Sequence, residues 1–364
     1  MKALRQVVCR LSRRERVYPS KTSSRQLSIA KPKAVFLNAS RLDYDGQLDF
    51  SSWHSLVDVH LHDADRVDDP STLLRLVQDA EIVVTKEMPI PAAVFAQFPE
   101  SVRLLCESGT GYNNLPIEAA RARNVAVCNT PTYSTEAVAH MAITYLMNFS
   151  VSMFQQQRML RCSGDRSNFM GPFTLPLHEI NGKVLGLVGG SGRIGSTVGK
   201  IGLALGMDVV ISSRKGTLPA DHSLADHPNV TCTDNLPHLL QQSDYVSLHT
   251  PLNEQTRHSF GRAQIEQMKP SAFLINTSRG AVCNEAELIA CMQEERIAGA
   301  GLDVTESEPP AANSPLWSLP NVFLSPHTGW RRLETRQRLV EMTAANMKAY
   351  CSATSEADYI NVVN

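Results

Sequence analysis

Residues 183–214 read KVLGLVGGSGRIGSTVGKIGLALGMDVVISSR, and this stretch decides the fold. An apolar run meets a glycine-rich turn, a helical pattern follows, and a second apolar run closes the unit. Gly190, Gly192 and Gly195 form G-x-G-x-x-G at the strand-to-helix junction, which is the spacing and context of a dinucleotide-binding turn. The backbone amides that begin the helix then offer partial positive charge to phosphates.

The alternative for this turn is a packing role without a ligand. The strand, turn, helix and strand occur in the order that a nucleotide site requires, so the cofactor interpretation is favoured. The turn residues predicted to bind the cofactor are Gly190, Gly192, Arg193, Ile194 and Gly195.

The end of the second strand indicates which dinucleotide binds. An acidic residue about 20 positions after the turn contacts the ribose in NAD-binding sites. Here the strand ends in Ser213-Arg214-Lys215, and Asp208 lies at its beginning. A small hydroxyl followed by two cations suits a 2′-phosphate, because Arg can bind it with two parallel hydrogen bonds. Ser213 and Arg214 therefore predict NADP(H), with NAD(H) possible. The alternative is that the two cations are ordinary solvated loop charges.

A chain of 364 residues with 20% charged and 43% apolar residues is typical of a globular protein with two domains. The net charge of −1 gives no basis for a nucleic-acid or membrane partner.

The eight cysteines lack metal-ligand spacing, so we expect free thiols and no metal site. Residues 137–154 are apolar with polar interruptions, which predicts a buried helix between domains rather than a membrane span.

Residues 1–30 differ in composition from the rest of the chain. They carry eight Lys or Arg against one acid, Glu15, and are rich in serine. This pattern is typical of a transit peptide, mitochondrial rather than plastid, and it predicts a mitochondrial location. The alternative is a disordered basic tail of a cytoplasmic protein.

From residue 31 onward, short apolar runs alternate with helical patterns, which indicates an α/β protein with doubly wound parallel sheets. We predict a substrate domain of residues 31–134 plus 333–364 and a dinucleotide-binding domain of residues 135–332. The expected strands are residues 34–37, 81–85, 102–106, 125–128, 184–188, 209–211, 230–232, 245–248, 273–276, 299–303 and 322–324. The expected helices are residues 71–78, 92–98, 116–123, one from about 135, and 236–241, 264–268, 285–294 and 333–350.

One glycine-rich turn, residues 108–114, follows the strand that ends at Cys106. Turns at the carboxyl edge of a parallel sheet are where small ligands bind. The backbone amides of this turn can hold a substrate carboxylate.

Three chemically active side chains follow the last three strands. Arg279 comes just after residues 273–276, Glu306 and Glu308 follow residues 299–303, and His327 follows residues 322–324. Since the carboxyl ends of parallel strands face one crevice, these groups are expected to converge.

A cation, a carboxylate and an imidazole together suit the interconversion of 2-keto and 2-hydroxy acids. Arg279 would bind the substrate carboxylate and polarise the keto oxygen. His327 would give and take the proton, and a carboxylate against it would stabilise the imidazolium and fix its tautomer. Taken singly, each residue also has a structural explanation, as a turn residue, a solvated loop acid or a buried structural histidine.

From residue 31 to the end, the chain resembles the D-isomer-specific 2-hydroxyacid dehydrogenases. The matching segments are residues 109–114, the G-R-I-G turn, and residues 248–252, 275–280, 299–309 and 325–329. The resemblance implies a Rossmann NAD(P)-binding domain inserted into a flavodoxin-like substrate domain. It also implies an Arg279–Glu308–His327 triad, with Glu308 chosen over Glu306 as the second acid before the proline. Further residues implied are Thr110 and Gly111 for the substrate carboxylate, and Thr250, Pro251, Thr277, Ser278, Asp303 and Gly329 beside the cofactor.

Within that family, residues 133–139, Gly329-Trp330 and the ending 360–364 look most like glycerate dehydrogenases, which are hydroxypyruvate or glyoxylate reductases. Two departures stand out: Gly189 is an extra residue before the phosphate turn, and Ser213 replaces the ribose-binding acid. We therefore expect an NAD(P)-dependent reductase of a small 2-keto acid, working as a homodimer by analogy with the family. The alternatives are a D-lactate or phosphoglycerate type of dehydrogenase, or a corepressor-like dinucleotide sensor without turnover.

Overall fold

The computed structural model describes residues 30–162, 169 and 175–364. The predicted transit peptide therefore lies, apart from Ala30, outside the described residues. Six cysteines are free, namely Cys106, Cys128, Cys232, Cys283, Cys291 and Cys351.

The first sheet has five parallel strands in the order β2-β1-β3-β4-β5. This is the flavodoxin-like order, in which the order of successive strands across the sheet reverses between β1 and β3. The strands are β1 (Lys33–Phe36), β2 (Asp58–Leu61), β3 (Ile82–Thr85), β4 (Leu104–Glu107) and β5 (Ala126–Cys128). The helices are α1 (Ala39–Leu42), α2 (Ser51–Leu56), α3 (Pro70–Val77), α4 (Ala92–Phe95) and α5 (Ile117–Ala122).

The second sheet has seven parallel strands in the order β12-β11-β10-β9-β6-β7-β8, which is the Rossmann order with one strand added. Its strands are β6 (Val184–Val188), β7 (Asp208–Ser212), β8 (Val230–Thr233), β9 (Tyr245–Leu248), β10 (Phe273–Asn276), β11 (Gly299–Leu302) and β12 (Val322–Leu324). Its helices are α6 (Thr135–Val151), α7 (Met153–Cys162), α8 (Arg193–Ala204), α9 (Leu236–Gln242), α10 (Arg262–Ile265) and α11 (Glu285–Gln293). The predicted fold class, two doubly wound α/β sheets, is confirmed.

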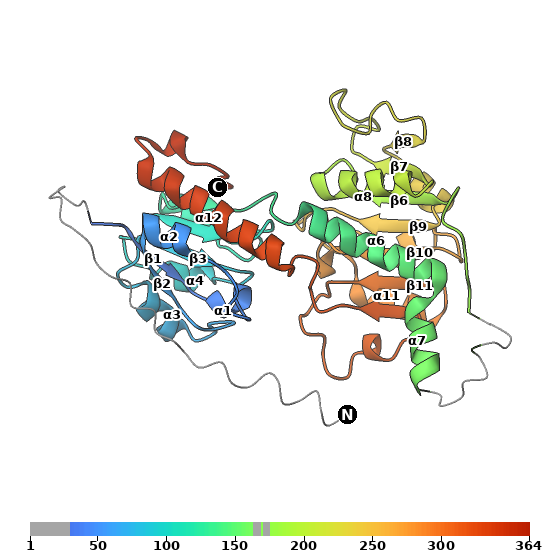
Figure 1. The fold of residues 1–364 in the computed structure, drawn as a ribbon, viewed down its shortest axis with the longest axis horizontal. Coiled ribbons are helices and arrows are strands. Elements are labelled where there is room, and N and C mark those ends of the chain that lie inside the picture. Colours follow the sequence, from blue (N-terminus) through green and yellow to red (C-terminus); the bar gives the residue numbers. More distant parts are fainter. Residues whose placement is uncertain (1–29, 163–168, 170–174) are drawn as a thin grey trace. The chain divides into compact units, whose positions relative to one another are not determined.

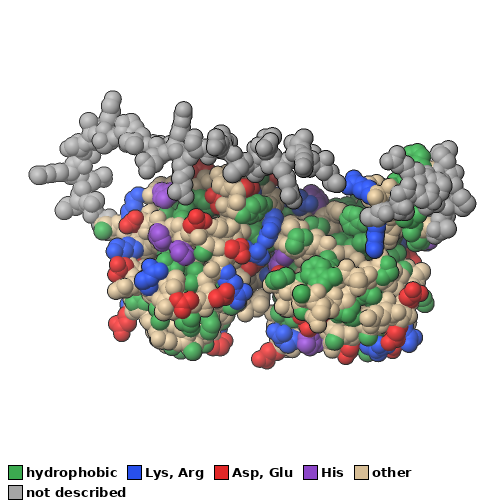
Figure 2. All heavy atoms as spheres, turned by 90° about the horizontal axis from the view of Figure 1, so that it is seen from below, with side chains coloured by type: hydrophobic (Ala, Val, Ile, Leu, Met, Phe, Trp, Pro, Cys, Tyr) green, Lys and Arg blue, Asp and Glu red, His purple; other side chains and the backbone are tan. Residues whose placement is uncertain are grey.

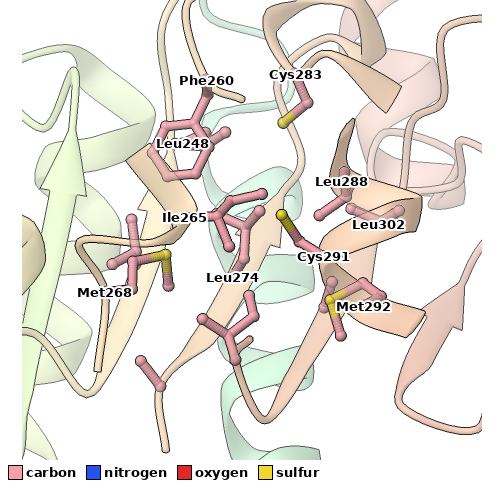
Figure 3. Close-up of a cluster of buried hydrophobic side chains, with 14 of the residues drawn as sticks. Leu248, Phe260, Ile265, Met268, Leu274, Cys283, Leu288, Cys291, Met292 and Leu302 are labelled. Carbon is pink, nitrogen blue, oxygen red and sulfur yellow. The ribbon is translucent and has the colours of Figure 1, made fainter. Parts of the chain in front are cut away.

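The central strands of both sheets, such as β3, β4, β9 and β10, are buried on two faces, which explains why they read as continuous apolar runs. Figure 3 shows one core in detail, with Leu274 of β10 among side chains of α10 and α11 such as Ile265 and Leu288. A fully buried leucine contributes about 1.5–3 kcal/mol relative to an exposed one. On the surface, Figure 2 shows acidic and basic side chains interspersed, in keeping with the small net charge.

The long apolar helix differs from its prediction in two ways. It breaks at Ser152, which has a left-handed backbone (φ 49°), so residues 137–154 are not one helix. Side chains around the break are exposed rather than buried, namely Met147, Val151, Met153 and Phe154. No single helix among the described residues is long and apolar enough to cross a membrane. Only the bent pair of α6 and α7, which meet at an angle of 63°, has a sufficient combined length and apolar content.

The last helix, α12 (Leu333–Ser352), packs on α2 and β4 of the first sheet (Figure 1). The tail after it also contacts this sheet, since Val362 forms an antiparallel bridge with Cys128 and the Val363 amide donates to the Val127 carbonyl.

An ion pair anchors α12 to the loop after α1. The Arg336 guanidinium is buried, and its two Nη atoms donate to the two oxygens of Asp45 at 2.9 and 2.6 Å. The hydrogen bond from Arg336 holds the pKa of Asp45 below its usual value. Breaking this pair leaves a buried cation without its carboxylate.

We expect Asp45→Asn to lower the free energy of unfolding by about 1.5–3 kcal/mol, the contribution of a hydrogen bond to a charged group. Because the pKa of Asp45 is lowered by folding, its contribution is present above the unfolded pKa of about 3.9 and is lost as the pH falls further. Urea unfolding at neutral and acidic pH measures this. Asp79→Asn is the control, since its pair with Lys33 is exposed and contributes about 0–1 kcal/mol. Equal losses in the two variants would contradict the prediction.

Candidate active site

The loops after β10, β11 and β12 line a cavity of about 920 Å³. Arg279, Glu308 and His327 all contribute to its wall, as does Gly111 from the turn after β4. The structure thus brings together the three residues that the sequence places after successive strands.

The His327 ring lies between two carboxylates. Its Nδ1 is 2.8 Å from Glu308 Oε2, and its Nε2 is 3.5 Å from Glu87 Oε1. When Nδ1–H donates to Glu308, Nε2 is the nitrogen left for a ligand in the cavity. The Thr305 amide in turn donates to Glu308 Oε1 at 3.3 Å, which helps to hold the carboxylate in place.

Asp303 holds the loop that carries His327. Its side chain accepts hydrogen bonds from the Ser325 hydroxyl and from the amides of Thr328 and Gly329, both at 2.9 Å. Its carbonyl accepts the His327 amide at 2.9 Å, and His327 has a left-handed backbone (φ 50°). Burial raises the pKa of Asp303 in spite of these hydrogen bonds. The structure therefore shows Asp303 as the anchor of the histidine loop, in addition to the cofactor contact that the resemblance implies.

Arg279 lies against the glycine-rich turn of the first sheet. A Cβ added to Gly111 would fall 1.9 Å from its Nη2, so only glycine allows this approach. The Arg279 Nη1 donates to the Ser278 carbonyl at 2.7 Å, which orients the guanidinium. Thr110 is not among the residues that line the cavity, and its hydroxyl donates to the Thr130 carbonyl at 3.2 Å.

Sequence reasoning missed the charged pair Lys86-Glu87, which directly follows β3. Lys86 is fully buried, with Nζ 2.9 Å from Glu87 Oε1 and 3.9 Å above the Trp330 ring. Burial alone would raise the pKa of Glu87, but Lys86, His327 and Arg41 outweigh it and hold that pKa well below its usual value. The sequence did contain a signal for this pair, namely two charged residues directly after an apolar strand. The same pattern, a charged residue after a parallel strand, located Arg279 and His327.

The backbone of Glu87 supports a functional interpretation of this pair. Glu87 has a left-handed φ of 55°, which is uncommon for a residue other than glycine. Such conformations persist where the surrounding structure determines them, and they concentrate at ligand sites.

The phosphate turn has the shape that a dinucleotide needs. Gly189 has φ 82°, and a Cβ there would meet His249 and Thr250 at 2.9 Å, so the extra residue must be glycine. A Cβ on Gly195 would lie 2.6 Å from the Gly190 Cα, which shows how closely α8 approaches the turn. Gly192 is exposed and caps the helix that begins at Arg193. The backbone amides at the start of α8 are therefore available to a phosphate.

Buried polar atoms in the loops after β9 and β10 lack partners within the described chain. They are the hydroxyls of Thr250 and Thr277 and the Nε2 of His249. Burial lowers the pKa of His249 to about 4, so its ring is neutral at pH 7. Orphaned hydroxyls after β9 and β10 fit a polar ligand that lies across the sheet edge. The other predicted cofactor residues occupy the same edge: Arg193 and Ile194 after β6, Pro251 after β9, Ser278 after β10 and Gly329 after β12.

At the end of β7, the Ser213 hydroxyl donates to the Thr217 carbonyl at 2.9 Å. Arg214 and Lys215 are exposed, and neither forms an ion pair within the part of the chain that the structure describes. Both cations are thus available to a ligand.

The chain is similar to known proteins over both sheets. Residues 143–329 match the family described as "D-isomer specific 2-hydroxyacid dehydrogenase, NAD binding domain". A hydroxypyruvate reductase of Blautia hydrogenotrophica is 31% identical over 88% of this chain and 96% of its own length. A glyoxylate reductase of Korarchaeum cryptofilum is 36% identical over 79% of this chain and 81% of its own. Among solved structures, an NADPH-dependent glyoxylate/hydroxypyruvate reductase from Sinorhizobium meliloti, in complex with NADP and malonate, aligns with a TM-score of 0.76 at 25% identity over 92% of this chain and 97% of that one.

Proposed function

This chain belongs to the D-isomer specific 2-hydroxyacid dehydrogenases, and from that premise we propose that it reduces hydroxypyruvate or glyoxylate. It is an NAD(P)-dependent oxidoreductase that transfers a hydride between the cofactor and a 2-keto acid. The choice of substrate rests on the names of its relatives, which are hydroxypyruvate and glyoxylate reductases.

In this proposal the protein's own groups bind the substrate and supply the proton. Arg279 binds the substrate carboxylate with two parallel hydrogen bonds, and the Gly111 amide beside it adds a further donor. His327 donates the proton from Nε2 to the keto oxygen, which becomes the hydroxyl. The cofactor supplies the hydride that forms the new C–H bond. Glu308 keeps Nδ1 protonated and stabilises the imidazolium.

The observation that carries this proposal is the contact of His327 with Glu308 in a cavity that Arg279 also lines. The test is turnover of a panel of 2-keto acids by the purified enzyme with NADPH and NADH. We expect measurable turnover of both hydroxypyruvate and glyoxylate. Absence of turnover with every 2-keto acid would contradict the proposal.

We further propose that the enzyme prefers NADP(H). Support comes from Ser213 at the ribose position and from Arg214 and Lys215, which are exposed and without an ion pair in the described chain. Arg214→Ala is expected to lower kcat/KM for NADPH by about 10- to 150-fold, the effect of losing one charge-assisted hydrogen bond. The value for NADH should stay within about threefold. Lys200→Ala, which removes an exposed cation from α8, is the control. A wild-type preference for NADH would overturn this proposal.

We propose a homodimer that uses the exposed apolar side chains at the α6–α7 break. Met147, Val151, Met153 and Phe154 are each 37–46% exposed, and such a group is typical of an interface. Light scattering during size-exclusion chromatography should give twice the mass of the chain. A monomeric mass at micromolar concentration would contradict the dimer.

Finally, we propose that residues 1–30 direct the protein to mitochondria. Their eight cations, single acid and serine content support this. A fluorescent protein fused to residues 1–30 should enter mitochondria, and the chain without them should not. A diffuse distribution of the fusion would contradict the proposal.

A further inference from the structure

Besides Arg279, the cavity wall includes three further arginines, Arg41, Arg66 and Arg331. Arg41 lies in α1, the helix after β1, and Arg331 follows β12; both line the cavity. Neither belongs to the triad, and neither was identified from the sequence.

Arg331 forms no direct ion pair among the described residues, although Glu87 and Asp65 lie near enough to act on its charge. Its side chain forms no ion pair or hydrogen bond with the residues that the structure describes, and its Nε is buried without a partner. The guanidinium lies 5.5 Å from the centre of the Trp330 ring and 5.7 Å from that of Tyr44. A cation beside aromatic rings is attracted to them without using its N–H groups, so the guanidinium keeps donors for the two hydrogen bonds by which arginine binds carboxylates and phosphates.

The neighbouring acids are already engaged. Glu87 accepts from Lys86 at 2.9 Å and from Arg41 at 3.1 Å. Asp65 is 3.9 Å from Arg41, and its side chain is 71% exposed. Burial lowers the pKa of Arg331, and the nearby positive charge of Arg41 lowers it further, while Glu87 and Asp65 offset part of this effect. An anion placed between the two guanidinium groups would remove that repulsion.

This second cationic site lies next to the reacting atoms. Glu87 Oε1 is 3.5 Å from His327 Nε2, and Glu87 Oε2 is 3.1 Å from Arg41 Nη2. The Glu87 carboxylate therefore contacts both Arg41 and the His327 nitrogen that protonates the keto oxygen in the proposed function. A substituent on the substrate carbon beyond the keto group can reach it.

We propose that Arg331, together with Arg41, binds a second anionic group at the far end of the 2-keto acid. This inference rests on the proposed function, since it places the substrate carboxylate on Arg279 and the keto oxygen on His327. The chemistry shared by the candidate groups is a compact oxyanion, either a carboxylate or a phosphate. The preferred substrates are thus 2-keto acids with two negatively charged ends.

The test compares kcat/KM for four substrates in the full-length enzyme. Glyoxylate has no tail and hydroxypyruvate has a neutral one, whereas 2-oxoglutarate ends in a carboxylate and 3-phosphohydroxypyruvate in a phosphate. The wild-type enzyme is expected to favour one of the two doubly anionic substrates, and which one it favours identifies the oxyanion.

Arg331→Ala should lower kcat/KM for the favoured anionic substrate by about 10- to 150-fold, mostly through KM, and change that for glyoxylate by less than about threefold. Arg331→Lys should recover part of the loss. Arg75→Ala, which removes an exposed cation on α3 outside the cavity, is the control. Turnover of glyoxylate also shows that each variant is folded.

Two results would overturn the inference while leaving the proposed function intact. One is equal losses for glyoxylate and the anionic substrates in Arg331→Ala. The other is a wild-type enzyme that favours glyoxylate or hydroxypyruvate over both doubly anionic substrates.

If no 2-keto acid is reduced, the proposed function fails, and the binding of malonate, succinate and glutarate then tests the inference. Thermal stabilisation by one of these dicarboxylates that Arg331→Ala abolishes supports the second anion site, and equal stabilisation of both proteins contradicts it.

Discussion

Arg279→Ala is expected to lower kcat/KM for 2-keto acid reduction by more than about 150-fold. Losing one charged hydrogen bond costs about 1.5–3 kcal/mol, or roughly 10- to 150-fold. Arg279 is assigned two roles, binding the carboxylate and polarising the keto oxygen, so its removal should exceed that range. Arg279→Lys should also be strongly impaired, because an ammonium cannot reproduce the planar two-hydrogen-bond contact.

Gly111→Ala tests the position of the guanidinium without removing its charge. The added Cβ would lie 1.9 Å from Arg279 Nη2, so the side chain must move away from its place in the cavity. We expect a loss of kcat/KM smaller than that of Arg279→Ala. Arg257→Ala removes an exposed cation outside the cavity and serves as the control. Near-full activity of Arg279→Ala would show that this residue does not bind substrate.

His327→Gln is expected to lower kcat by about 10²- to 10⁴-fold, the usual contribution of a general acid. The 2.8 Å contact with Glu308 places its Nε2 toward the cavity, and glutamine cannot supply an equivalent proton. Glu308→Gln should lose less, because its amide oxygen still accepts from Nδ1–H while the negative charge is gone. Stopped-flow measurement of NADPH oxidation in a single turnover separates this chemical step from binding.

A structural role for His327 predicts a different result. In that case His327→Gln would lower the melting temperature and change KM and kcat together. A variant that is stable, binds NADPH as the wild type does and still reduces substrate at the wild-type rate would exclude His327 as the proton donor.

The sheets could be predicted because their central strands are buried on both faces. Strands such as β6, β9 and β10 were predicted to the residue, since a run of apolar residues between turns has few other interpretations. β2 lies at the edge of its sheet, where alternate residues are exposed, and it was not among the expected strands. Residues 92–98 and 264–268 were predicted as longer helices than α4 and α10, because apolar periodicity continued beyond the last helical turn.

The charged partners of His327 followed less directly from the sequence. Glu308 was chosen from two neighbouring acids by resemblance, and the hydrogen bond from the Thr305 amide now shows how the loop holds it. Glu87 lies 240 positions before His327, and no local pattern relates the two. Their contact depends on the turn after β3 meeting the loop after β12 in one cavity.

The sequence therefore determined those features that repeat along the chain or follow from local order: the two parallel sheets, the phosphate turn, and the strand ends that carry Arg279 and His327. Local patterns have this power because apolar periodicity and glycine spacing act within a few residues of each other. Only the tertiary structure decided that Glu87 lies against the His327 imidazole and that Arg331 lines the same cavity without a direct ion pair among the described residues. The physical reason is that charge pairing depends on distance in space, which loops from different strands set only when both sheets are in place.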